Sequence, residues 1–168
     1  MNKSIVRSVR VVSNASEASA APSVHVGLFP STEGTDNQAE LLTTWAHLFG
    51  YRDQVLAKLE DARIAKVIGS SLEARVEISA GSHAFEKLAH HRDDLRYIFI
   101  VSEVSLAAPN AELGADELAV TISRAHGEKC DRCWNYSTRV GESSRYPTVC
   151  ERCVEALQEI EVLGGSPI

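Results

Sequence analysis

Hydrophobic residues recur at three- and four-residue steps between positions 36 and 68, a spacing that predicts an amphipathic helix. Gly50 interrupts the pattern and is expected to divide or bend the helix, and Gly69 is expected to cap its end in the left-handed conformation. A stripe of this kind predicts a helical face that packs against other helices. Its members are Leu41, Trp45, Leu48, Val55, Leu59 and Ala62.

The pattern changes after this helix. Residues 72–78 alternate between apolar and polar side chains, which predicts a half-buried strand. A second, shorter helix is expected from about Ser82 to Leu95, and residues 96–104 are rich in β-branched and aromatic side chains, which predicts a buried strand. A further strand is expected over residues 118–122. The order indicates an α+β fold, with a helical segment followed by a small mixed α/β unit.

All four cysteines of the chain lie near its end, in two C-x2-C pairs separated by 16 residues. Each pair can form a tight knuckle, and two knuckles complete a tetrahedron of sulfur ligands, so the spacing is typical of a structural zinc site. Paired disulfides or a thioredoxin-like redox motif are alternatives, but no secretory signal is apparent and the setting is rich in loops. The sequence therefore predicts a C-terminal four-cysteine zinc ribbon with one structural zinc ion, bound by Cys130, Cys133, Cys150 and Cys153.

Charge is unevenly distributed along the 168 residues. The net charge of -6 argues against a generally basic nucleic-acid-binding surface, yet residues 124–153 carry six basic and four acidic side chains. No apolar run approaches the roughly twenty residues that a membrane span requires. We therefore expect a cytoplasmic protein without membrane contact, whose zinc segment is the basic part of its folded region.

Basic and aromatic side chains alternate in this segment, which suits contact with RNA phosphates and unstacked bases. The candidate RNA-binding residues are Lys129, Arg132, Trp134, Arg139, Arg145 and Arg152. In the alternative interpretation, the arginines pair with nearby carboxylates and Trp134 packs on the knuckle. The position of Trp134 directly after a cysteine favours packing for that side chain.

Two stretches resemble a known family. Residues 66–74, Lys-Val-Ile-Gly-Ser-Ser-Leu-Glu-Ala, together with the preceding helix, resemble the end of the anticodon-binding domain of isoleucyl-tRNA synthetases. The motifs Cys130-Asp-Arg-Cys-Trp134 and Cys150-Glu-Arg-Cys153 resemble the carboxy-terminal zinc finger of that family, a type shared with formamidopyrimidine-DNA glycosylases.

The resemblance implies four regions. Residues 1–22 would be a flexible or unmatched arm, and residues 23–123 would hold the end of the helical anticodon-binding domain and the small mixed unit. Residues 124–157 would form the zinc finger, and residues 158–168 a tail. The family's His-Ile-Gly-His and Lys-Met-Ser-Lys-Ser signatures are not found in this sequence, so the chain by itself is not expected to activate isoleucine or to edit.

The function that this resemblance implies is binding of isoleucine tRNA as the carboxy-terminal portion of an isoleucine-tRNA ligase, with the catalytic part of the synthetase as a further partner. No arrangement of catalytic residues is recognisable from spacing. The main alternative is a stand-alone zinc-ribbon adaptor that binds RNA or protein. A DNA-repair glycosylase fits poorly, because its amino-terminal proline nucleophile has no counterpart in the opening Met-Asn-Lys.

Overall fold

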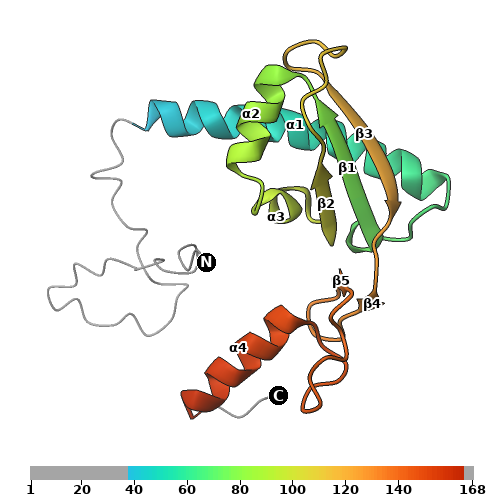
Figure 1. Cartoon of the computed structure of the whole chain (residues 1–168), viewed down its shortest axis with the longest axis vertical. Coiled ribbons are helices and arrows are strands. Elements are labelled where there is room, and N and C mark those ends of the chain that lie inside the picture. The colour runs from blue at the N-terminus through green and yellow to red at the C-terminus, as the bar shows by residue number, and fades with distance from the viewer. Residues whose placement is uncertain (1–37, 165–168) are drawn as a thin grey trace, which may run out of the picture. The chain divides into compact units, whose positions relative to one another are not determined.

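The computed structural model describes residues 38–164 (Figure 1). The expected arm over residues 1–22, the start of the region expected over residues 23–123 and the last four residues of the expected tail lie outside this range. In the part of the chain that is described, no helix has both the length and the apolar character needed to cross a membrane.

A three-stranded sheet forms the centre of the α/β unit. Its strands are β1 (Ala74–Ala80), β2 (Glu103–Leu106) and β3 (Leu118–Arg124), in the order β2-β1-β3. β1 pairs in parallel with β2 and antiparallel with β3, so the chain must cross over between β1 and β2. The crossover holds the helices α2 (Ser82–His90) and α3 (Leu95–Phe99). A 3-10 turn, η2 (Ser71–Glu73), precedes β1.

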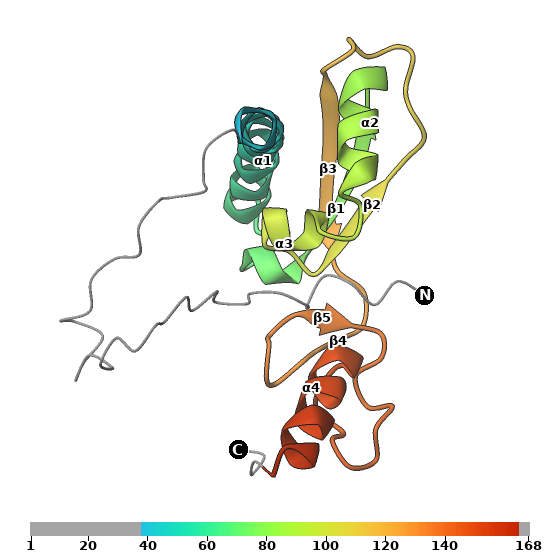
Figure 2. The same ribbon diagram turned by 90° about the vertical axis from the view of Figure 1, so that its left-hand side faces the viewer.

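The long helix α1 (Ala39–Ile64) lies on one face of the sheet, as Figures 1 and 2 both show. Every second residue of β1 is buried, and the neighbouring strand β3 contributes Val120 and Ile122 to the same core. α1 packs Val55 and Leu59 into this core, and both side chains are almost fully buried. The alternation along β1 thus gives the sheet one apolar face, which α1 covers.

The α+β class is confirmed, but several local predictions were wrong. α1 runs through Gly50 without a break, because a glycine inside a helix costs only about 1 kcal/mol and packing against the sheet offsets this. The helix ends at Ile64, and the left-handed residue is Lys66 (φ 59°) instead of Gly69. The amide of Val67 donates to the Ala62 carbonyl at 2.9 Å, as in a Schellman cap.

The strand expected over residues 96–104 is also partly wrong. Its first half forms α3, and only the segment from Glu103 is a strand. Leu95 and Phe99 are four residues apart, so one turn of helix buries both on the same side, and each is fully buried. Tertiary packing therefore overrides the β propensity of this segment, and Tyr97 and Ile100 remain exposed.

The hydrophobic stripe of α1 divides between two environments. Leu48 is 1% exposed and belongs to the core, whereas the residues before it on the helix face solvent. The exposed apolar side chains of this half are Leu41, Leu42, Trp45 and Phe49. The expectation of one continuous packed face is thus met only by the second half of the helix.

The cysteine-rich module follows β3 directly. It contains the short hairpin strands β4 (Glu128–Lys129) and β5 (Tyr136–Ser137), a loop, and the helix α4 (Glu151–Val162). α4 crosses the boundary that we expected between residues 157 and 158, so residues 158–162 of the expected tail are helical. The module has a small core of its own, which shares no buried residue with the core of the α/β unit.

Candidate metal centre and adjoining surface

The first cysteine pair lies on the hairpin that β4 and β5 form. The amide of Cys130 donates to the Asn135 carbonyl at 2.9 Å, and the amide of Trp134 donates back to the Cys130 carbonyl at 2.9 Å. These bonds close a tight turn around Cys130 and Cys133. Gly127, at φ 81°, starts the hairpin, and a Cβ at this position would lie 2.2 Å from the Ser137 carbonyl oxygen. Only glycine fits there without a shift of the backbone.

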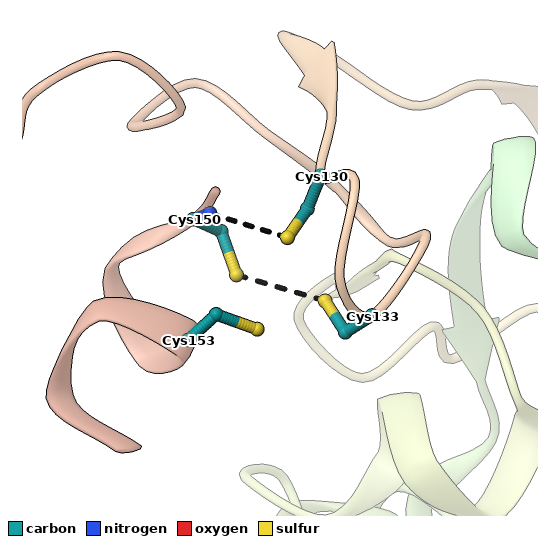
Figure 3. Close-up of side chains that lie close together, drawn as sticks. All are labelled: Cys130, Cys133, Cys150 and Cys153. Atoms are coloured by element: carbon teal, nitrogen blue, oxygen red, sulfur yellow. Dashed lines mark hydrogen bonds between the residues drawn. The ribbon is translucent and has the colours of Figure 1, made fainter. Parts of the chain in front are cut away.

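The second pair lies at the start of α4. Cys150 is the N-cap residue of this helix and Cys153 lies in its first turn. The amide of Cys150 points at the sulfur of Cys130, with 3.3 Å between the nitrogen and Sγ. Figure 3 shows the four side chains converging from the hairpin turn and the helix start on one point. The sequence indicated the spacing of this pair but not its place on a helix.

The four sulfur atoms have the geometry of a zinc site. All lie within 4.8 Å of one another, and the sulfurs of Cys133 and Cys150 are 3.7 Å apart. Zinc-sulfur bonds of about 2.3 Å in a tetrahedron place the sulfurs about 3.8 Å apart, so one ion fits between them. Three of the four residues are buried and Cys133 is partly buried. A shell of four thiolates leaves no position for water, which makes the ion structural.

Protonation of the cysteines is unequal in the metal-free chain. Burial would raise the pKa of the Cys133 thiol, but hydrogen bonds, chiefly from Asn135, lower it to about 6. Burial raises the pKa of Cys150 to about 12 and also raises the pKa of Cys153. Zinc must therefore displace protons from thiols that hold them tightly, which makes its binding dependent on pH.

Two arginines lie against the sulfur cluster. Arg132 Nη1 is 3.8 Å from the Sγ of Cys153, and Arg152 lies near enough to Cys133 that this thiol helps to raise the pKa of its guanidinium group. Four thiolates around one Zn²⁺ carry a net charge of -2, so two guanidinium groups at this distance offset that charge. Both residues were candidates for RNA binding, and this contact gives each of them a second role in the centre.

The other basic candidates for RNA binding lie away from the sulfur atoms. Arg139 pairs with Glu142 at 2.9 Å and Arg145 pairs with Glu161 at 2.6 Å, as expected if the arginines pair with carboxylates. Lys129 has no carboxylate partner among the described residues, and its Nζ lies 5.5 Å from the centre of the Trp134 ring. The Arg139–Glu142 pair is exposed on both sides and holds weakly, so Arg139 can exchange its partner for phosphate at small cost, whereas the largely buried Glu161 holds Arg145 more firmly.

Trp134 does not pack on the knuckle, and the preference for packing was wrong. The side chain is 61% exposed, and its backbone is left-handed at φ 64°. The left-handed conformation turns the chain sharply after Cys133, and the Trp134 side chain faces solvent next to Lys129. The knuckle therefore presents an aromatic ring with a cation above it.

Sequence reasoning missed the residue that joins the two modules. Ser102, at the end of the α3 turn, is buried, and its hydroxyl donates to the Leu72 carbonyl at 2.5 Å. The same oxygen accepts a hydrogen bond from the amide of Tyr136 in β5 at 2.7 Å. No pattern in the sequence indicates this contact, because the partners are 34 residues apart.

These features define the chain as a small α/β unit that carries a zinc finger with one structural metal ion. Residues 127–156 match the family described as "Zinc finger found in FPG and IleRS". This range contains all four cysteines and the hairpin that holds the first pair.

Similarity to curated proteins extends well beyond the finger. The chain is 50% identical over 116 residues to an isoleucine–tRNA ligase of Gloeobacter violaceus, covering 67% of this chain and 12% of that ligase. It is 42% identical over 134 residues to the ligase of Nostoc punctiforme, covering 70% of this chain and 14% of that ligase. The ligase of Syntrophotalea carbinolica is 42% identical over 142 residues, which cover 82% of this chain and 15% of that ligase.

The resemblance to the carboxy-terminal region of isoleucine–tRNA ligases is thereby confirmed. The matched residues span 12% to 15% of the length of these relatives.

Proposed function

We propose that this chain binds isoleucine tRNA as the zinc-containing carboxy-terminal portion of an isoleucine–tRNA ligase, and that the catalytic part of that enzyme is its partner. The similarity to isoleucine–tRNA ligases over most of the chain supports this function. The zinc ion would hold the finger in shape and would take no part in chemistry, since four thiolates complete its shell.

The exposed Trp134 on the knuckle is the observation that carries the proposal. An indole ring that is 61% exposed offers a flat face for an unstacked base, which is how proteins commonly bind single-stranded RNA loops. Lys129 lies beside the ring and can neutralise the phosphate of a nucleotide stacked there. The left-handed backbone of Trp134 costs about 1–2 kcal/mol relative to glycine, which is consistent with selection for its side chain.

The decisive measurement is filter binding of the zinc-loaded chain to isoleucine tRNA at one fixed salt concentration. The same tRNA with an exchanged anticodon serves as the competitor. We expect tighter binding of the natural tRNA and a loss of binding when a chelator removes zinc. Equal binding of both tRNAs would contradict the recognition of isoleucine tRNA.

Substitution of each of the two tryptophans in the chain provides a matched pair. Trp134→Ala should weaken tRNA binding by roughly 1–3 kcal/mol, the usual contribution of a stacked base. Trp45→Ala removes the same side chain from α1 and should leave affinity unchanged. Zinc content and circular dichroism of both variants establish that each one is folded.

The alternative of a zinc-ribbon adaptor that binds protein has one observation in its favour. The exposed apolar residues in the first half of α1, which include Trp45 and Phe49, are a surface that a protein partner can cover. If the chain binds no RNA, a zinc-ribbon adaptor that binds protein becomes the better interpretation.

A further inference from the structure

Tyr97 lies on α3 with two arginines against its ring. Its side chain is 49% exposed, and the guanidinium carbon of the neighbouring Arg96 lies 4.7 Å from the ring centre. Arg152 approaches from α4, with its guanidinium carbon 5.6 Å from the same centre. Both donate to the phenolic oxygen, Arg96 at 2.6 Å and Arg152 at 3.2 Å. Two segments 55 residues apart thus bring two positive charges to one exposed oxygen.

This pair of charges has no carboxylate partner in residues 38–164. Seven arginine or lysine ion pairs and two histidine–carboxylate contacts are formed there, and neither Arg96 nor Arg152 belongs to any of them. Glu151 lies close enough to Arg96 to interact through its charge, but its carboxylate accepts a hydrogen bond from the hydroxyl of Ser137 at 2.8 Å. The neutral phenol of Tyr97 is therefore the shared acceptor for two cations that repel each other; the thiolates of the metal centre offset part of the Arg152 charge, whereas no ion pair offsets the Arg96 charge.

An anion would relieve this repulsion. A phosphate group presents several acceptor oxygens, and a guanidinium group can form two parallel hydrogen bonds to it. The hydroxyl of Tyr97 accepts from both arginines and still has its own proton to donate to a phosphate oxygen. The site thus offers two cations and one hydroxyl donor on an exposed surface.

We propose that Arg96, Tyr97 and Arg152 form a binding site for a phosphate group of an RNA backbone. The inference rests on the proposed function in that RNA supplies this phosphate. Arg152 also lies near Cys133, which directly precedes Trp134 in the chain, so this site and the exposed ring both involve the finger. The RNA surface extends from the finger onto the α/β unit, in a segment where the sequence predicted a buried strand.

The dependence of RNA binding on salt tests this site. Each phosphate contact contributes about one to the slope of the logarithm of affinity against the logarithm of salt concentration. The double variant Arg96→Gln with Arg152→Gln should reduce this slope by about one and weaken binding about tenfold or more. The loss should be the same for isoleucine tRNA, an anticodon-exchanged tRNA and oligouridylate, because a phosphate contact carries no sequence information.

Arg92→Gln is the matched control. It removes one guanidinium group from an exposed position in the same segment and away from Tyr97, and it should leave the slope unchanged. Because Arg152 also lies beside the zinc centre, zinc content is measured for every variant. If the double variant loses zinc, the single variant Arg96→Lys is tested in its place. The ammonium group of lysine keeps the positive charge, so the salt slope of RNA binding should stay unchanged. It cannot form two parallel hydrogen bonds to a phosphate, so affinity should fall.

The outcomes separate this site from the proposed function. A normal slope and affinity in a double variant that retains zinc, or unchanged affinity in Arg96→Lys, would overturn the phosphate site. If the original chain binds all three RNAs equally and the variants weaken each one, the site stands while recognition of isoleucine tRNA fails. If the original chain binds none of these RNAs, both proposals are refuted.

Discussion

Removal of zinc should unfold the finger and leave the α/β unit folded. The core of the finger contains five buried residues, and three of them are cysteines. Only Val149 and Leu157 are ordinary apolar side chains, and their burial contributes about 3–6 kcal/mol in total. A structural zinc ion typically contributes about 10–16 kcal/mol to the folding of such a module, so the metal dominates its stability. The α/β unit has sixteen buried residues in a separate core and does not depend on the ion.

Amide hydrogen exchange before and after chelation measures this directly. The amides of Cys130 and Trp134 are bonded within the hairpin and should lose their protection, whereas those of Val76 and Ile78 in β1 should keep it. Restoring zinc should restore the hairpin amides. The variant Cys153→Ser should behave like the chelated chain, and Ser144→Ala, an exposed substitution in the same finger, should behave like the original. Protected hairpin amides after chelation would refute the argument, as would loss of protection throughout β1.

Three further substitutions test the α/β unit and its contact with the finger. Burial, with a hydrogen bond to Asp116, raises the pKa of Tyr51 to about 12, so the folded state keeps a proton that the unfolded state loses near its ordinary value of 10.0. Stability should therefore fall between pH 10 and 12 by at most about 2.7 kcal/mol in urea denaturation, and Tyr51→Phe should remove this part of the fall. Lys66→Gly should raise the free energy of unfolding by about 0.5–1 kcal/mol, because glycine adopts a positive φ without strain, whereas Lys58→Gly within α1 should lower it. Ser102→Ala leaves the partly buried amide of Tyr136 without its acceptor and should cost about 0.5–1.5 kcal/mol, with faster exchange at that amide; unchanged exchange would contradict the contact.

The zinc centre was predictable from the sequence because the spacing of the cysteines within each pair identifies it without knowledge of tertiary contacts. Two residues between cysteines set the knuckle, and all four cysteines of the chain are used. Alternation of apolar side chains also predicted strands close to β1 and β3, since one face of each contributes to the core. The similarity to isoleucine–tRNA ligases was recognisable from residues 66–74 with the preceding helix and from the two cysteine motifs.

Features that depend on tertiary contacts were not predictable. α3 forms where Leu95 and Phe99 fill the core, although Tyr97, Ile98 and Ile100 around them favour a strand. The approach of Arg152 to Tyr97 depends on how α4 lies against α3, which no spacing in the sequence encodes. The exposure of Trp134 follows from its left-handed backbone, a conformation that a sequence pattern would assign to glycine or asparagine first.

At position 134, the stability of the finger and the proposed binding of RNA favour different residues. Glycine would fit the backbone there with less strain and should make the finger more stable, yet it would remove the ring offered to RNA. Attempts to engineer a more heat-resistant form of this protein by relieving strain would therefore select against its proposed function at this position. A stability screen and an RNA-binding screen of the same library should favour opposite residues at this single site.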